Sequence, residues 1–284
     1  MEKIIYNLHN HTSCSDGELT VNELIVLNKK HGIKYLSITD HNTIKAYKQL
    51  REYSDITIIP GVEFDSKEDY EIVGLNIDIN NDSLIEYTNR CEWFINLVLK
   101  NNIHLINEYY GTKITLAKIR ESDNRTMLTK KKLSILCYKL YPDIFKKNDS
   151  VKHFLATIDK SKKINIEYKS IKEIITLIHN ASGYAILPHP LNYFKNWGFI
   201  KYLRLYKFLK LLKSYGIDGV ETQRSDTTLY QDLIVSFIVK KLELFQSGGS
   251  DFHMLEDKVP YKWFYKKNKK SQLHFIKILL GGKI

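Results

Sequence analysis

Two histidines near the start of the chain, His9 and His11, stand one residue apart in the segment NLHNHTSCSDG, and Asp16 follows them. In an extended strand, residues i and i+2 project to the same face, so both imidazoles could bind one metal ion. The same pair could also be two ordinary polar residues at the end of a strand. By itself the pair leaves both interpretations open.

Histidines and carboxylates recur where other predicted strands end. They come after the apolar segments LSIT, IIPGV, AILP and LFQSGG, and they are Asp40, His41, Glu63, His189, Asp251 and His253. In a parallel barrel the carboxyl ends of the strands converge on one mouth, where active sites are built. This clustering favours a metal centre over isolated polar residues.

The elements that must position these residues alternate between strand and helix patterns. Capping boxes at Thr20–Glu23 and Ser170–Glu173 predict the starts of two helices. The segment 43–53 (TIKAYKQLREY) predicts another helix, and ITIIPGVEF (56–64) and YEIVGLNID (70–78) predict strands. Later segments continue this pattern up to LELFQSGG.

Between residues 83 and 169 the alternation stops. The segment SLIEYTNRCEWFINLVLKNN (83–102) predicts a long helix, and the segments after it have helical patterns with basic connectors. We therefore predict a barrel domain formed by residues 1–82 and 170–284, with residues 83–169 inserted as a helical subdomain.

Five motifs occur in order along the chain: H-N-H…SDG, I-T-D-H, G-V-E, L-P-H-P and G-G-S-D-F-H. Together they resemble the PHP (polymerase and histidinol phosphatase) superfamily. The resemblance implies an α/β fold, a distorted (β/α)7 barrel with an inserted helical domain and a trinuclear metal site. Within that superfamily the chain resembles the small phosphoesterases similar to nucleoside 3′,5′-bisphosphate phosphatases and 5′→3′ exoribonucleases.

The resemblance also implies three groups of ligands. The first metal ion would be held by His9, His11, Glu63 and Asp251, with Glu63 bridging to a second ion held by His189. The third would be held by Asp16, His41 and His253. Since imidazole and carboxylate are mixed, we expect two or three divalent ions of Mn²⁺, Fe²⁺ or Zn²⁺. The residues expected to be catalytic are His9, Asp16, His41, Glu63 and Asp251.

Glu71 stands where the family usually has a histidine ligand of the second metal. A carboxylate is a harder donor and lowers the net positive charge of the site, which favours Mn²⁺ or Fe²⁺. We expect Glu71 to be a ligand. The alternative is that it points to solvent and the second site is empty.

Two arginines are expected to bind phosphate. Arg125, in SDNRTML, resembles the arginine of the family's R-P-H segment, and the family histidine falls on Met127. Arg224 follows the predicted strand IDGVET at the barrel mouth. For Arg125 the alternative is an exposed arginine at a helix start.

These features predict a metal-dependent phosphoesterase that hydrolyses phosphate esters of nucleotides or short oligonucleotides with a metal-activated hydroxide. One alternative is a histidinol-phosphate-type phosphatase. Another is a non-catalytic binding module on a PHP scaffold, which would lack ligands. The net charge of +11 reflects either a compositional bias or a surface for polyanions. The run KWFYKKNKK (262–270) is either a contact for single-stranded nucleic acid or a solvated face.

Composition points to a globular protein of the cytoplasm. Hydrophobic residues make up 43% of the chain, and no run of 18 apolar residues occurs, so we expect no membrane segment. The N-terminal residues do not resemble a signal peptide. Three cysteines without a C-x-x-C pair fit a reducing compartment. No obligate protein partner is implied.

Overall fold

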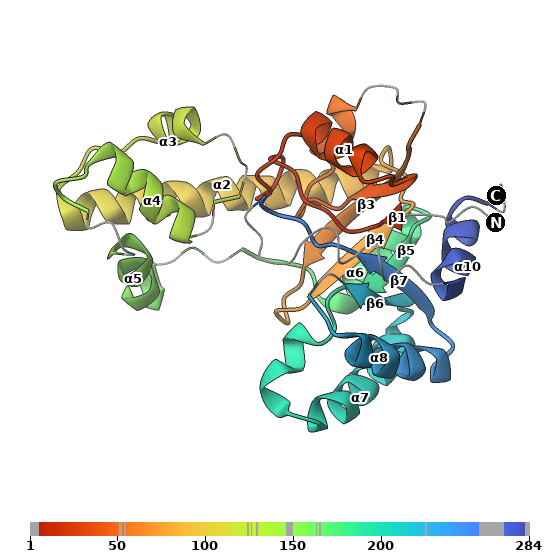
Figure 1. Cartoon of the computed structure of the whole chain (residues 1–284). Coiled ribbons are helices and arrows are strands. Elements are labelled where there is room, and N and C mark those ends of the chain that lie inside the picture. The colour runs from red at the N-terminus through yellow and green to blue at the C-terminus, as the bar shows by residue number, and fades with distance from the viewer. Residues whose placement is uncertain are drawn as a thin grey trace.

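Seven strands form one sheet that closes almost completely into a barrel, surrounded by helices (Figure 1). The computed structural model describes residues 6–50, 53, 55–123, 125, 127–128, 130–145, 150–162, 164, 166–224, 226–255 and 270–281. The strands lie side by side in chain order: β1 (Tyr6–Asn7), β2 (Tyr35–Ile38), β3 (Thr57–Asp65), β4 (Glu71–Leu75), β5 (Tyr184–Leu187), β6 (Gly219–Arg224) and β7 (Phe245–Gly249). The predicted α/β barrel of seven strands is confirmed.

The barrel closes where the chain beyond β1 pairs with the chain beyond β7. The Asp251 N–H donates to the His9 carbonyl, and the His11 N–H donates to the Phe252 carbonyl, both at 2.9 Å. Gly249 permits this approach, because a Cβ there would lie 2.3 Å from the His9 Cβ. The closure therefore places the first and last motifs against each other.

β4 is the source of the barrel's distortion. It runs antiparallel to both β3 and β5, whereas the other neighbouring pairs in the sheet are parallel. Its first residue, Glu71, pairs with Asp65 at the end of β3. The start of β4 therefore lies at the same mouth as the carboxyl ends of the other strands.

Helices pack around the sheet over two clusters of aliphatic and aromatic side chains, and the last helix belongs to the second cluster. They are α1 (Val21–Lys30), α6 (Ile171–Asn180), α7 (Ile200–Tyr215), α8 (Leu229–Lys241) and α10 (Lys270–Leu279), with the 3-10 helix η3 (Asn192–Trp197) before α7. Both predicted capping boxes, at Thr20 and Ser170, are present. The local sequence therefore predicts correctly where α1 and α6 begin.

The helix predicted over residues 43–53 is wrong in type, because the described residues of this segment (43–50 and 53) form only the short 3-10 helix η1 (Lys45–Gln49). The buried Tyr47 hydroxyl accepts from the Gly61 N–H at 2.6 Å and donates to the Ile38 carbonyl. This anchoring holds a tight turn on the sheet and overrides local helix propensity.

A helical region extends to one side of the barrel at the far end of α2 (Asp82–Tyr110) (Figure 1). It contains α3 (Leu116–Ser122), α4 (Lys130–Leu140), α5 (Ser150–Thr157) and the 3-10 helix η2 (Lys160–Lys162). The first half of α2 packs on the barrel core through Leu84, Tyr87 and Cys91. The second half packs in a separate core, formed by Leu99, Ile103, Ile106, Ile114, Ile119, Leu133, Leu136, Cys137, Phe145, Val151 and Leu155.

Among the described residues, no helix combines the length and the apolar character that crossing a bilayer requires.

Candidate metal centre

His9 and His11 lie fully buried at the barrel mouth, just after β1. Their Nε2 atoms are 3.1 Å apart, so both rings turn to the same side, as the i and i+2 spacing predicts. The backbone pairing of this segment with residues 251–252 holds both rings at the centre of the mouth.

Four ligand atoms form a first group: His9 Nε2, His11 Nε2, Glu63 Oε2 and Asp251 Oδ1. Each Nε2 lies 3.2 Å from Glu63 Oε2 and 3.4 Å from Asp251 Oδ1. A tetrahedral ion with bonds of about 2.0–2.1 Å has ligand–ligand edges of about 3.3–3.4 Å. The observed spacings therefore fit one divalent ion.

Glu63, Glu71 and His189 form a second group. The His189 Nε2 lies 3.1 Å from the second oxygen of Glu63, Oε1, and 3.1 Å from Glu71 Oε2. Glu63 thus directs one oxygen at each of two groups. The Glu71 side chain points into the mouth and is 29% exposed, because the antiparallel β4 begins there.

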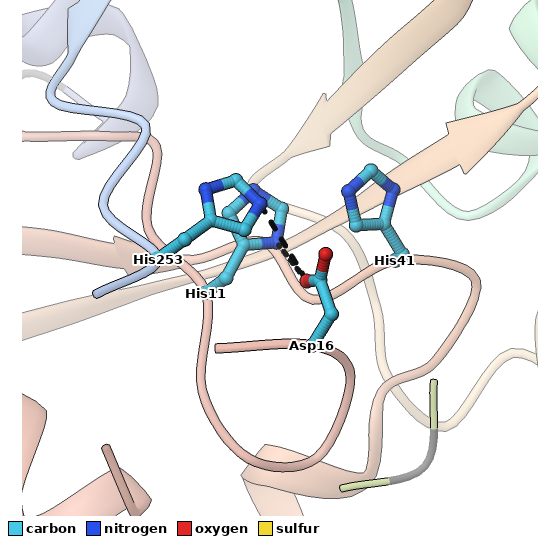
Figure 2. A group of neighbouring side chains, drawn as sticks. All are labelled: His11, Asp16, His41 and His253. Carbon is cyan, nitrogen blue, oxygen red and sulfur yellow. Dashed lines mark ion pairs between the residues drawn. The ribbon is translucent and has the colours of Figure 1, made fainter. Parts of the chain in front are cut away.

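Asp16, His41 and His253 gather in a third group, beside His11 (Figure 2). The Asp16 Oδ1 lies 3.5 Å from His253 Nε2 and 3.8 Å from His11 Nδ1. The His41 Nε2 lies 3.4 Å from Glu63 Oε2, which links this group to the first. All nine predicted metal ligands therefore meet within one cluster.

One unpaired nitrogen in the cluster, His11 Nδ1, faces the third group and fits metal binding, because it lies 3.8 Å from Asp16 Oδ1. Among the described residues, the Nδ1 atoms of His11, His41 and His189 have no hydrogen-bond partner. Burying an unpaired polar atom costs free energy, so such atoms are uncommon without a ligand or water.

The cluster holds the shared carboxylate of Glu63 ionised. Burial alone would raise the pKa of Glu63, but the neighbouring His9 and His41 bring it well below its usual range. Burial would likewise lower the pKa of His11, yet hydrogen bonds with Asp251 and Glu63 raise it to about 10. Without metal, protons on His9, His11 and His41, whose pKa values are raised, therefore balance part of the negative charge that metal ions would balance.

Glu221 on β6 orients the histidines of the first two groups. Its Oε1 lies 2.7 Å from His9 Nδ1, and its Oε2 accepts from the His189 backbone N–H at 2.8 Å. A carboxylate on the far nitrogen of a histidine fixes the tautomer that presents Nε2 to a metal. This contact of Glu221 with the histidines was not predicted from the sequence. The position of Glu221 on a strand that ends beside the ligands could have indicated it.

Arg224 lies buried beneath the mouth and is 5% exposed. Its guanidinium donates to Asp226 at 2.7 and 2.9 Å, to Glu221 at 3.3 Å and to Asp251 Oδ2 at 3.3 Å. The structure thus places Arg224 against carboxylates behind the ligands, a position from which it orients Asp251.

Asp40, which the sequence placed among the strand-end residues, lies behind the opening motif. Its buried carboxylate accepts from the Thr12 N–H at 2.7 Å, the Thr12 hydroxyl at 2.6 Å and the Ser15 hydroxyl at 2.7 Å. These bonds shape the loop that carries Asp16 toward the other ligands.

Arg125 reaches the same loop from the helical region. Its Nη1 donates to the Asp16 carbonyl at 3.3 Å, while its Nε and Nη2 bind the Asp123 carboxylate at 2.9 and 2.6 Å. The side chain is 12% exposed. Arg125 is therefore held at the edge of the cluster rather than free at a helix start.

A cavity of about 240 Å³ opens over the ligands, lined by His41, Glu63, Glu71, His189, Asn192, Tyr193, Asp251 and His253. Three residues at the mouth have left-handed backbone conformations, with φ of 55° at Asn42, 31° at His189 and 53° at Asp251. Such conformations are costly for residues with side chains, and they concentrate at functional sites.

Residues 7–219 match the family model of the PHP domain. The chain belongs to the PHP domain family. With the ligand cluster at its barrel mouth, this PHP protein is a metal-dependent phosphoesterase, as the ordered motifs predicted.

Relatives of this PHP protein include 5'-3' exoribonuclease Rnm of Escherichia coli strain K12. That enzyme is 27% identical over 268 residues, which cover 88% of this chain and 85% of the relative. The 5'-3' exoribonuclease of Haemophilus influenzae is 27% identical over 259 residues, covering 87% and 89%. A solved structure from Bifidobacterium adolescentis superposes with a TM-score of 0.72 at 18% identity, covering 98% and 97%. The last comparison shows the shared fold.

Proposed function

We propose that this enzyme hydrolyses a phosphate ester of a nucleotide or short oligoribonucleotide, using two or three divalent ions at the barrel mouth. The observation that carries the proposal is the sharing of Glu63 between two groups of ligands, with a third group at 3.4 Å from it. Neighbouring ion sites of this kind suit a phosphoryl group, which has several oxygens to bind at once.

Three sets of side chains would hold the ions. The first ion would bind His9, His11, Glu63 and Asp251, the second Glu63, Glu71 and His189, and the third Asp16, His41 and His253. We propose Mn²⁺, Fe²⁺ or Zn²⁺, because the sets mix imidazole and carboxylate. Bound ions would lower the pKa of water and neutralise negative charge on the phosphoryl oxygens.

Residues around the ligands position the reacting groups. Glu221 holds His9 in the required tautomer, and Arg224 holds Asp251 through a bond of 3.3 Å. Burial raises the pKa of Tyr193 well above its usual range, so its hydroxyl stays a donor beside Glu71 in the cavity. These residues fix geometry without forming a covalent intermediate.

Arg125 is our candidate for a phosphate ligand from the helical region. It lies next to the Asp16 loop, and its guanidinium could reach a phosphate at the third group after a small rearrangement of its pairing with Asp123. Arg224, also expected to bind phosphate, is proposed instead as a positioning residue, because three carboxylates surround it. We also propose that residues 83–169 act as a subdomain, which the separate helical core supports.

A nucleotide substrate is supported by the two exoribonuclease relatives and by the net charge of +11. The run KWFYKKNKK does not bear on this, because its residues 262–269 lie outside the described residues. A reducing cytoplasmic location remains part of the proposal.

A substrate panel with Mn²⁺ tests the function. We would measure phosphate release from mononucleotides, nucleoside 3′,5′-bisphosphates, 5′-phosphorylated oligoribonucleotides and histidinol phosphate. Alanine at His9, Asp16 or Asp251 should abolish release, while circular dichroism shows a folded barrel. Turnover of histidinol phosphate alone would favour the small-molecule alternative. Full activity in the alanine variants would refute the metal assignment.

A further inference from the structure

A second cavity, of about 160 Å³, lies between α2 and the segment that carries Arg125. Four of its wall residues follow helical spacing along α2, and they are Ile95, Val98, Leu99 and Asn102. Residues three and four apart share one face of a helix, so these side chains form a single stripe. Met127 and Leu128 form part of the opposite wall.

The chemistry of the walls suits a flat ring with a polar edge. Aliphatic side chains and the Met127 thioether, which makes favourable contacts with aromatic rings, offer apolar surface. Asn102 and Asp16 are the polar residues of this lining, and in the described part of the chain the Asn102 amide has no hydrogen-bond partner. An amide presents a donor and an acceptor side by side, which matches the edge of a nucleobase.

The cavity borders the metal centre, because Asp16 lines it and also belongs to the third group of candidate ligands. The opposite wall is tied to the same loop. The Met127 N–H donates to the Ser15 carbonyl at 2.9 Å, and Arg125 donates to the Asp16 carbonyl at 3.3 Å. A phosphate at the third group would therefore place a group attached to it at the entrance of the cavity.

We propose that this cavity binds a nucleobase of the substrate, on the nucleotide that carries the scissile phosphate. The inference rests on the proposed phosphoesterase function and adds to it a cause of selectivity. The metal centre recognises phosphate, which many metabolites carry. The cavity of α2 and Met127 makes the enzyme prefer phosphates that are attached to a base.

Filling the cavity tests this proposal. Val98 is half-buried in the stripe, and Val98→Phe places a ring in the space that the base would occupy. We would compare kcat/KM for a nucleoside 3′,5′-bisphosphate with kcat/KM for ribose 5-phosphate, which has no base. Because base stacking contributes substantially to binding, the ratio of the two values should fall roughly 10- to 100-fold. Val26→Phe on α1 is the matched control, because Val26 is 61% exposed and does not line this cavity.

Asn102→Leu is the second variant, and it keeps the volume of the wall while removing the donor and acceptor. It should change the order of preference among the four bases. A purely structural role of Asn102 would change all four nucleotides equally. A Val98→Phe ratio equal to that of the wild type, or an Asn102→Leu preference order that does not change, would overturn the proposal.

Binding separates this inference from the proposed function. Calorimetry would titrate adenosine 5′-monophosphate and ribose 5-phosphate into the metal-loaded protein. If no member of the substrate panel is hydrolysed under any condition, the proposed function fails, and binding still decides the cavity. If the wild type binds the nucleotide more tightly than ribose 5-phosphate, and Val98→Phe abolishes that difference, the base site is supported. Equal binding of both ligands by the wild type would refute it.

Discussion

Replacing Glu221 by glutamine should weaken metal binding, although the side chain keeps its size. The carboxylate accepts on both sides, from His9 Nδ1 at 2.7 Å and from the His189 backbone N–H at 2.8 Å, and Arg224 lies 3.3 Å away. A glutamine has one acceptor and one donor end. With its oxygen toward His9, its NH₂ group faces the His189 N–H and Arg224, which are donors themselves.

The opposite orientation is no better. With its NH₂ group toward His9, the amide requires the Nδ1 atom as an acceptor, so the ring proton moves to Nε2. That nitrogen is the one directed at Glu63 and Asp251, at 3.2 and 3.4 Å. A proton there blocks metal coordination. In one orientation the amide therefore loses the hydrogen bonds from His189 and Arg224, and in the other it leaves His9 Nε2 protonated.

The loss is the size of one charged hydrogen bond, about 1.5–3 kcal/mol. It corresponds to a fall of roughly 10- to 150-fold in metal affinity, since about 1.4 kcal/mol is tenfold. The assay is competition for Mn²⁺ or Zn²⁺ against a chelator of known affinity, followed by metal analysis of the protein. Circular dichroism would confirm that the barrel stays folded.

Glu86→Gln is the matched control, because Glu86 lies exposed on α2 away from the ligands. It should leave metal affinity unchanged. A Glu221→Gln protein that binds metal within about twofold of the wild type would refute the reasoning, because it would show that the far-side carboxylate does not control His9.

Four further predictions concern the same cluster. Gly249→Ala should reduce metal content and kcat/KM on the order of 100-fold. The new Cβ would lie 2.3 Å from the His9 Cβ, so it must displace that ligand by about 1 Å. A variant that keeps the metal content per protein and the activity of the wild type would contradict this. Glu71→His should raise the ratio of Zn²⁺ to Mn²⁺ bound from an equimolar mixture, because imidazole is the softer donor; an unchanged ratio would place Glu71 outside the ligands. Metal affinity should rise with pH between about 6 and 9, because the metal-free protein holds a proton on His11, whose pKa is about 10, and the ion must displace it. In the metal-free protein that same proton stabilises the fold below the ordinary pKa of 6.5, and its contribution is lost as pH rises toward about 10, which unfolding measured over this range would show.

Local sequence was sufficient to predict much of the scaffold. The capping boxes at Thr20 and Ser170 start helices where they were expected, because cap side chains bind backbone groups only three residues away. The segment 43–53 shows the limit of this reasoning. Its helical pattern was overridden because the Tyr47 hydroxyl bonds to the backbone of β2 and β3. The sequence of the segment alone does not indicate such a contact.

The sequence by itself determined which residues are expected to be ligands and to gather at the barrel mouth. Histidine and carboxylate at strand ends must converge in a barrel whose parallel strands finish at one mouth, and the order of the motifs indicated the family. The nine expected ligands do gather there. Side-chain type and strand position carry this information, and both are readable along the chain.

Only the tertiary structure decided how the cluster is oriented and supported. Glu71 turns inward because β4 runs antiparallel, and strand direction depends on neighbours rather than on the strand's own residues. The sequence suggested that Arg224 faces the substrate, whereas folding surrounds it with carboxylates. Glu221 gained its role because β6 brings it to within 2.7 Å of a histidine 212 positions earlier in the chain. Such pairings arise from packing between distant segments, so they exist only in the folded protein.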